Sequence, residues 1–229
     1  MSSPIRIISS MATKQLLADL VTQYHQASGQ AVELESVGGV DAARRVKAGE
    51  AFDAVILASD AIDRLIAEGH VVAGSRVDLV RSGVAVAVRA GAPVPDLSSE
   101  AAVRQAVLGA ASLSYSTGPS GVALQALFER WGIAEQIRAR IVQAPPGVPV
   151  GSLVADGRVE LGFQQLSELI NLPGITIAGP LPPAIQILTV FSGGVAATST
   201  QPDAVRAVLE LMRSPAAAAA KRRQGMEPV

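Results

Sequence analysis

The sequence predicts an α/β fold, because strand-like and helix-like runs alternate along most of its 229 residues. Short apolar runs, typical of buried strands, alternate with amphipathic runs that have helical spacing. The first three helical runs each stop at a glycine, as helices often do. Two longer β-rich runs, 79–89 and 185–196, bracket the middle of the chain. Such alternation is typical of a parallel sheet covered by helices.

The N-terminal third predicts three strand–helix pairs in succession. Its first strand is a short apolar run, and the amphipathic helix that follows ends before Gly29. In sheets of this kind, ligands bind beyond the carboxyl ends of the strands. In chain order the predicted elements are strand 5–9, helix 12–28, strand 31–36, helix 41–48, strand 53–58 and helix 60–68.

The alternation resumes after a break. Val84, Val86 and Val88 alternate with other residues in the run 79–89, as in a strand, and the Gly- and Pro-containing stretch 91–96 then interrupts the pattern. The predicted elements that follow are helix 99–108, strand 111–115, helix 121–131, strand 141–143, helix 150–155, strand 159–164, the β run 185–196, helix 202–212 and the alanine-rich helical stretch 216–220.

The two long β runs predict a chain of two lobes joined by a two-strand hinge. Lobe 1 consists of residues 1–82 plus 193–229, and lobe 2 of residues 83–192. Each lobe is expected to be a mixed sheet flanked by helices. Loops at the strand ends of both lobes would then face one interlobe cleft.

Three strand-to-helix turns predict the binding of a small anion. The most informative is Ser116–Gly121, and similar turns stand at Ser9–Met11 and Ser36–Gly39. Small hydroxyl and glycine residues at such turns leave the first backbone N–H groups of the helix free to bind an anion. Ordinary N-capping, worth about 1 kcal/mol, is the competing explanation for any single turn.

Composition excludes several classes of function. Aromatic residues make up 3% of the chain and the formal net charge is −1, which argues against a nucleic-acid surface. With no cysteine and only two histidines, no metal site or cofactor is predicted. No segment has the uninterrupted apolar length of a membrane span. The N-terminus lacks signal-peptide features, so the protein is periplasmic if a signal peptide has been removed and cytoplasmic otherwise.

Several stretches in a characteristic order resemble a known family. They are Ile7–Met11, Ala42–Val46, Gly49–Ile56, Gly74–Arg76, Gly118–Gly121, Leu211–Ala216 and Gly225–Met226. The whole chain resembles a type 2 periplasmic substrate-binding protein, of the molybdate-binding branch of ABC transporters. The resemblance implies the two-lobed fold of that class, an ABC transporter permease as a partner, and a monomer. Some relatives of this class are aconitate isomerases.

The resemblance also implies a ligand site. The family's oxyanion contacts would fall on Ser10, on Gly39 or Val40, and on Ala58 in lobe 1, and on Ser120, the 147–148 stretch and Gln165 in lobe 2. Gly39 or Val40 replaces a family serine, Gln165 replaces a tyrosine, and Leu57-Ala58-Ser59 replaces Ser-Ala-Asp. The full predicted ligand-binding set is Ser9, Ser10, Met11, Gly38, Gly39, Val40, Ala58, Ser59, Tyr115, Ser116, Thr117, Ser120, Gly147, Val148, Gln164 and Gln165.

The first functional hypothesis is a substrate-binding protein that holds a carboxylate or oxyanion through backbone N–H groups and Ser, Thr and Gln donors. The altered positions favour a carboxylate over molybdate or tungstate, which stay as a further alternative. The second hypothesis is an isomerase of the aconitate isomerase type, which needs a base beside the carbon acid. The acidic side chains near the turns are Asp41, Asp60 and Glu168, and each also suits an ordinary helix N-terminus. Arg44 or Arg81 would suit a carboxylate clamp.

Overall fold

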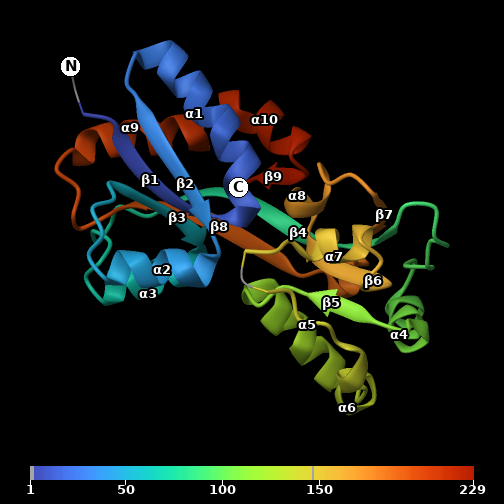
Figure 1. Cartoon of the computed structure of the whole chain (residues 1–229). Helices are drawn as coiled ribbons and strands as arrows, with labels where there is room; N and C mark the ends of the chain where they lie inside the picture. The colour runs from blue at the N-terminus through green and yellow to red at the C-terminus, as the bar shows by residue number, and fades with distance from the viewer. Residues whose placement is uncertain (1–2, 146) are drawn as a thin grey trace. The chain divides into compact units, whose positions relative to one another are not determined.

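The computed structural model describes residues 3–145 and 147–229, so the first two residues of predicted lobe 1 lie outside the described part. The chain divides into two compact units. Unit 1 combines Met1–Ser82 with Thr189–Val229, and unit 2 is Gly83–Leu188. The blue, teal and red parts of Figure 1 belong largely to unit 1, and the green and yellow parts to unit 2.

Unit 1 is built around three parallel strands. The central strand β1 (Ile5–Ser10) pairs with β2 (Val32–Val37) on one side and with β3 (Ala54–Ala58) on the other. The strand β8 (Leu188–Val195) then adds to β3 in the antiparallel direction. The parallel strands therefore end together at one edge of the sheet, where the predicted turns at Ser9–Met11 and Ser36–Gly39 lie.

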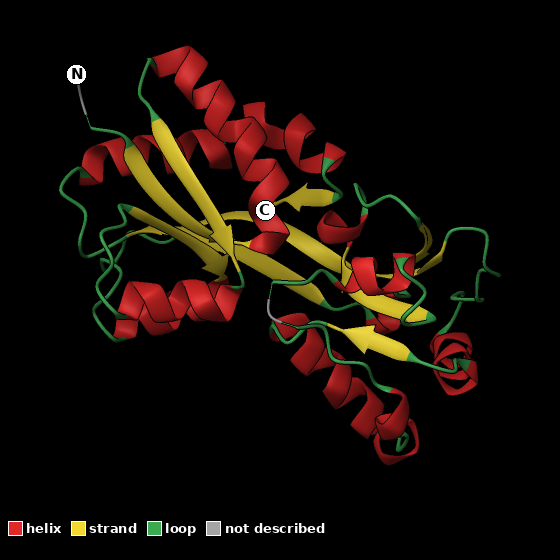
Figure 2. Ribbon diagram, viewed as in Figure 1, coloured by secondary structure: helices red, strands yellow, loops and turns green. Residues whose placement is uncertain are grey.

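Two separate cores cover the two faces of this sheet. Ile5 and Ile7 of β1 join the core with helices α1 (Lys14–Ser28), α9 (Pro202–Arg213) and α10 (Ala218–Arg223), whereas Ile8 joins the core with α2 (Gly39–Lys47) and α3 (Ser59–Ala67). This split follows from the alternation of side chains along a strand. Figure 2 shows the helices as red coils beside the yellow strands. Short elements complete the unit: the 3-10 turns Met11–Thr13 and Pro215–Ala217, and β9 (Met226–Pro228).

Unit 2 contains both antiparallel and parallel strand pairs. The second half of β4 (Val77–Arg89) pairs antiparallel with β6 (Leu161–Gln165) and with β7 (Ile175–Pro180), and β5 (Leu113–Tyr115) pairs parallel with β6. The helical elements of this unit are α4 (Glu100–Gly109), α5 (Pro119–Arg130), α6 (Ala134–Ile137), α7 (Val150–Ala155), α8 (Leu166–Leu169) and the 3-10 turns Arg138–Arg140 and Pro183–Ile185.

The predicted α/β class is confirmed, with one correction to the sheets. The strand order β2-β1-β3-β8-β4-β6-β5 is continuous, with β7 and β9 also paired to β4, so the chain does not contain two separate sheets. The physical reason is the length of β4, which pairs with β9 in unit 1 through Val80–Ser82 and with β6 in unit 2 through Val84–Ala87. The lobe boundaries and the hinge stay predictions.

Most predicted elements are found within a few residues of their expected limits, and the exceptions are short. The predicted strand 141–143 is reduced to a single bridge between Ile141 and Leu113. The predicted β run from 185 begins as a 3-10 turn, and its strand starts at Leu188. Strands β7 and β9 were not predicted. In the described part of the chain, no helix combines the length and the apolar character that a membrane crossing requires.

Candidate functional site

The carboxyl ends of β5 and β6 gather the predicted residues of unit 2 at one edge. These strands are parallel, with Tyr115 opposite Phe163, so the turn after β5 and helix α8 after β6 begin at the same edge. Helix α7 packs on β6. The first turn of α7 lies at this edge, as shown by the hydrogen bond that the backbone N–H of Gly151 donates to Gln164 Oε1 at 3.3 Å. The edge therefore brings together three segments that are distant in sequence: 115–121, 147–151 and 164–168.

The turn Ser116–Gly121 is tightly built around a glycine. The carbonyl oxygen of Ser116 lies 1.6 Å from the point where a Cβ on Gly121 would sit, so no side chain fits there. The hydroxyl groups of Ser116 and Ser120 are 3.1 Å apart and share a hydrogen bond. Helix α5 has Gly118 at its N-cap and no side chain capping it. Ordinary capping by a serine or threonine therefore does not account for this turn.

Gln164 and Glu168 form a part-buried polar pair at the end of β6 and in α8. Gln164 is only 3% exposed, and its Nε2 donates to Glu168 Oε1 at 2.9 Å. Glu168 lies on α8, and its side chain is only partly exposed. Burial raises the pKa of the Glu168 carboxyl to about 7, against the smaller lowering effect of the Gln164 hydrogen bond. A carboxyl group with this pKa is able to accept and return a proton near neutral pH.

The other predicted residues of unit 2 surround the same edge in different ways. Gln165 is buried at the end of β6, opposite Val84. The Tyr115 ring packs edge-on against Phe128 in the core, and burial together with the nearby Glu129 raises the pKa of its phenol. Thr117, Gly147 and Val148 are exposed.

Unit 1 presents a second group of neutral donors at the ends of its parallel strands. The Ser9 and Ser36 hydroxyl groups, on neighbouring strands, are 2.8 Å apart. Ser10 Oγ is buried and has no hydrogen-bond partner among the described residues. A Cβ on Gly39, the first residue of α2, would lie 3.8 Å from Ser10 Cβ, so this hydroxyl stands beside the start of that helix. No side chain caps α2 or α3.

The remaining predicted residues of unit 1 also lie at this edge. Gly38 is the N-cap of α2 and Ala58 the N-cap of α3, so both stand where a strand passes into a helix. Ser59 begins α3 and Met11 follows β1 directly. Val40, in the first turn of α2, is 71% exposed.

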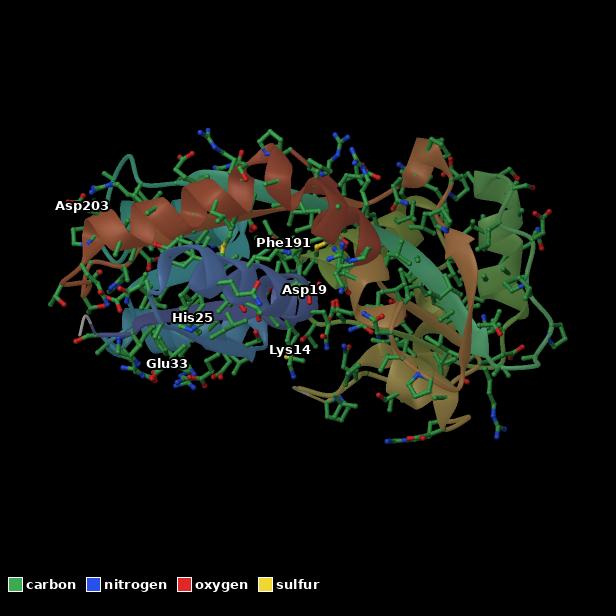
Figure 3. All side chains as sticks on the ribbon, turned by 90° about the horizontal axis from the view of Figure 1, so that it is seen from above. Lys14, Asp19, His25, Glu33, Phe191 and Asp203 are labelled. Carbon is green, nitrogen blue, oxygen red and sulfur yellow. The ribbon has the colours of Figure 1, made fainter. Side chains whose placement is uncertain are left out.

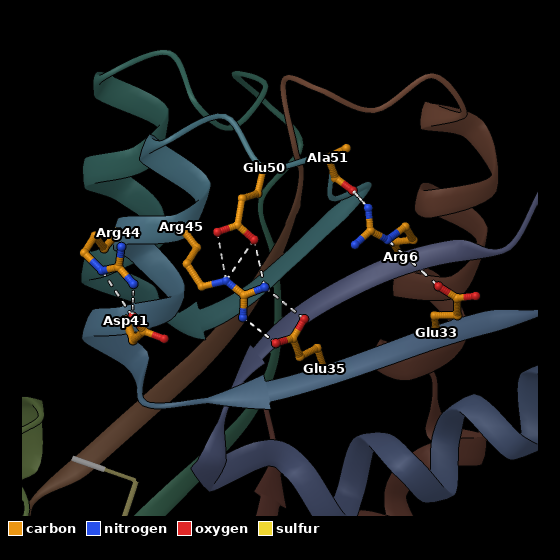
Figure 4. A network of polar contacts seen from close by, with 8 residues as sticks. All are labelled: Arg6, Glu33, Glu35, Asp41, Arg44, Arg45, Glu50 and Ala51. Atoms are coloured by element: carbon orange, nitrogen blue, oxygen red, sulfur yellow. Dashed lines mark hydrogen bonds and ion pairs between the residues drawn. The ribbon is translucent and has the colours of Figure 1, made fainter. Parts of the chain in front are cut away.

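Asp41, Asp60 and Arg44, which the sequence analysis considered, all have ion-pair partners. Figure 4 shows Arg44 paired with Asp41 on the surface of α2, and Arg45 held by both Glu35 and Glu50. Asp60 pairs with Arg64 at 2.9 Å and is more than half exposed. Glu168 forms no such surface ion pair with a described residue, and burial raises the pKa of its carboxyl.

Histidine and metal chemistry receive no support from the described residues. His25, labelled in Figure 3, is exposed on α1, and its Nδ1 lies 3.1 Å from the carbonyl oxygen of Gln30. No group of three His, Asp or Glu residues in the described part of the chain is arranged to hold a metal ion.

Comparison with known proteins identifies the family. The family of bacterial extracellular solute-binding proteins matches residues 5–227. The chain belongs to this family. The resemblance drawn from the short stretches above is therefore confirmed at the level of the family and its fold.

Individual relatives of this solute-binding protein have two kinds of description. An aconitate isomerase from a Pseudomonas species is 38% identical over 231 residues, which cover 98% of this chain and 88% of that protein. The periplasmic molybdate-binding protein of Azotobacter vinelandii has a TM-score of 0.80 at 21% identity, covering 97% of this chain and 98% of the other. The sulfate-binding protein of Mycobacterium tuberculosis has a TM-score of 0.80 at 17% identity, covering 100% and 88%. The two structural likenesses show the fold alone.

Proposed function

We propose that this solute-binding protein is an isomerase that moves a double bond within a small unsaturated polycarboxylate, with Glu168 as the proton carrier. The observation that carries the proposal is the hydrogen-bonded pair of Gln164 and Glu168 after β6, in which burial raises the pKa of the Glu168 carboxyl to about 7. The 38% identity to an aconitate isomerase over 98% of the chain supports aconitate as the first substrate to test.

The proposed reaction needs one base and no net change of atoms. In aconitate, a methylene group lies next to a carboxylate and to the carbon–carbon double bond. Glu168 as carboxylate removes a proton from this methylene, and the electron pair left behind moves the double bond by one carbon. The same carboxyl then returns the proton to the carbon of the original double bond that is farther from the former methylene. A group with a pKa near the working pH serves both steps well, because it is neither too weak a base nor too weak an acid.

The neutral donors would stabilise the negative charge that exists on the substrate after the proton is removed and before it is returned. Removal of the proton spreads negative charge into the neighbouring carboxylate, whose oxygens need hydrogen-bond donors at that moment. The hydroxyl groups of Ser116 and Ser120 and the N-terminal N–H groups of α5 supply such donors in unit 2. In unit 1, the unpartnered Ser10 hydroxyl stands beside the start of α2 and is a donor of the same kind. We propose the sixteen predicted residues as the ligand-binding set on this basis.

The decisive experiment measures turnover and a matched pair of variants. Purified protein is mixed with trans-aconitate or cis-aconitate, and conversion is followed by proton NMR. Glu168→Gln is expected to lower kcat/KM by about 10²–10⁴, the usual contribution of a general base. The control is Glu135→Gln, an exposed glutamate of unit 2 that pairs with Arg138, and it should leave the rate unchanged.

A second function, binding of a small anion without turnover, is favoured by membership of the solute-binding family. That alternative includes the molybdate or tungstate ligand, the closing hinge, the transporter partner and the periplasmic location expected from the sequence. A thermal-shift screen separates the two. Saturation at 100 times Kd adds about 2.7 kcal/mol of stability. Stabilisation by an anion, combined with no conversion of aconitate, would reject the isomerase proposal in favour of the binding one.

A further inference from the structure

We infer that Gln164 is a positioning residue whose amide holds Oε1 of Glu168 and leaves Oε2 as the atom that carries the proton. The naming of Oε2 rests on the proposed function. We call the contacts of the Gln164 side chain with the Gly151 N–H and with Glu168 Oε1 the clamp. The clamp itself lies within the protein and is testable without a substrate.

The contacts fix the orientation of the Gln164 amide. The backbone N–H of Gly151 is only a donor, so the atom of Gln164 that faces it at 3.3 Å must be the oxygen, Oε1. The amide nitrogen therefore points the other way, where it donates to Glu168 Oε1 at 2.9 Å. This contact occupies Oε1, and not Oε2, of the Glu168 carboxyl.

Two glycines bring the three groups into register. A Cβ on Gly162, two residues before Gln164 on β6, would lie 2.5 Å from a methyl carbon of Val154, so α7 packs directly against the strand backbone. A Cβ on Gly151 would lie 2.5 Å from a methyl carbon of Leu172. Larger residues at either position would push α7 away and take the Gly151 N–H out of reach of the amide. The clamp is therefore built into the packing of α7 on β6.

The surroundings of Glu168 contain few other charges. Glu168 is the only charged residue within α7, α8, β6 and β7. The unit 2 part of β4 adds only Arg89, whose guanidinium nitrogen lies 3.4 Å from the Cβ position of Gly157, beyond the far end of α7. Burial and the Gln164 amide are accordingly the two influences that act on the carboxyl. Burial favours the protonated form, and the amide donor favours the carboxylate.

The test is the proton affinity of Glu168 in a ligand-free variant. Gln164→Met keeps an unbranched side chain of similar length but removes the donor. The pKa of Glu168, read by NMR from carboxyl-¹³C-labelled glutamate and assigned with Glu168→Gln, should rise by about one unit. The acid limb of the pH–kcat/KM profile with aconitate should move to higher pH by the same amount. A purely structural effect would lower the rate without moving the acid limb.

The matched control is Gln125→Met. Gln125 donates to Glu129 Oε1 at 3.3 Å with the same four-residue spacing, but on the exposed surface of α5, and its removal should leave the pKa of Glu168 unchanged. An unaltered Glu168 pKa in Gln164→Met would overturn the clamp. A raised pKa with an unshifted rate profile would uphold the clamp and overturn the role of Glu168 in catalysis. If Gln164→Met does not fold, Gln164→Glu replaces it, since a second carboxyl there should raise the pKa further.

Discussion

Glu168 binds its proton more tightly in the folded protein than in the unfolded chain, because burial raises its pKa from an ordinary 4.5 to about 7. The sign of the effect on stability follows from linkage. The folded state holds the extra proton between these two values, so the contribution to stability is fully present below about pH 4.5 and is lost as pH rises through 7. This residue therefore weakens the fold under the conditions in which it would act as a base.

Glu168→Gln should remove that loss. The free energy of unfolding of the variant minus that of the unsubstituted protein should increase by about 2 kcal/mol as pH rises from 5 to 8. The reason is that a neutral amide has no charge to desolvate. Urea unfolding at the two pH values measures the gain, with Glu135→Gln as the control that should show none. The same difference at both pH values would contradict the raised pKa. A variant that is more stable yet inactive would place Glu168 among sites where function costs stability.

At the scale of an element, the turn before α5 depends on the missing side chain of Gly121. In Gly121→Ala the new Cβ would meet the Ser116 carbonyl oxygen, so the backbone of the turn must move. We expect a loss of about 3 kcal/mol or more, in line with severe overpacking, and a fall in Tm of several degrees. Differential scanning calorimetry checks this.

Gly109, the last residue of α4, provides the opposite case for comparison. No atom lies within 4 Å of its Cβ position, so Gly109→Ala should instead stabilise the protein by about 0.5 kcal/mol through the higher helix propensity of alanine. Equal effects of the two substitutions would show that the Ser116 carbonyl does not restrict the turn.

The strands and helices were predictable because they depend on local patterns. The apolar run that predicts a strand over 5–9 becomes β1, and Gly29 ends α1 in the left-handed conformation that favours glycine. The strand β9 was missed because Met226–Pro228 is too short to carry a period and pairs only through the distant β4. Local patterning does not report which faraway strand a short segment will meet.

The raised pKa of Glu168 was not predictable from the sequence, for a related reason. Three residues after the end of a strand, it has the same local setting as many acids that favour a helix N-terminus. Its proton affinity comes from the close packing of α7 on β6 and from Gln164, and a long-range packing arrangement leaves no local signal. Asp41 and Asp60 looked equivalent in sequence and are surface ion pairs in the structure.

At the scale of the whole molecule, unit 2 is one uninterrupted stretch of chain and unit 1 is two. Unit 2 has its own core, with Val84 and Ile185 from its two ends among the members. Its two ends are connected by a backbone hydrogen bond, in which the Val84 N–H donates to the Ile187 carbonyl oxygen at 3.1 Å. Unit 1, in contrast, needs residues from both of its stretches, since β8 pairs with β3 and α9 supplies Val205 and Leu209 to its core.

The fragment 83–188 should therefore fold by itself, as expected of a unit with its own core, whereas the fragment 1–82 should not. Circular dichroism should show cooperative thermal unfolding for the first and a largely unfolded spectrum for the second. A fragment 83–188 without cooperative unfolding would mean that this unit depends on the rest of the chain.

The divided path of unit 1 has a consequence for biosynthesis. Domains fold as units while the chain emerges from the ribosome, usually in order from the N-terminus. Here the segment that closes unit 1, in which Ser199 and Gln201 bond to Asp53, is made only after all of unit 2. Unit 1 is thus the first to begin and the last to be completed during synthesis. The strand β3 has no β8 to pair with until more than a hundred residues of unit 2 have been synthesised.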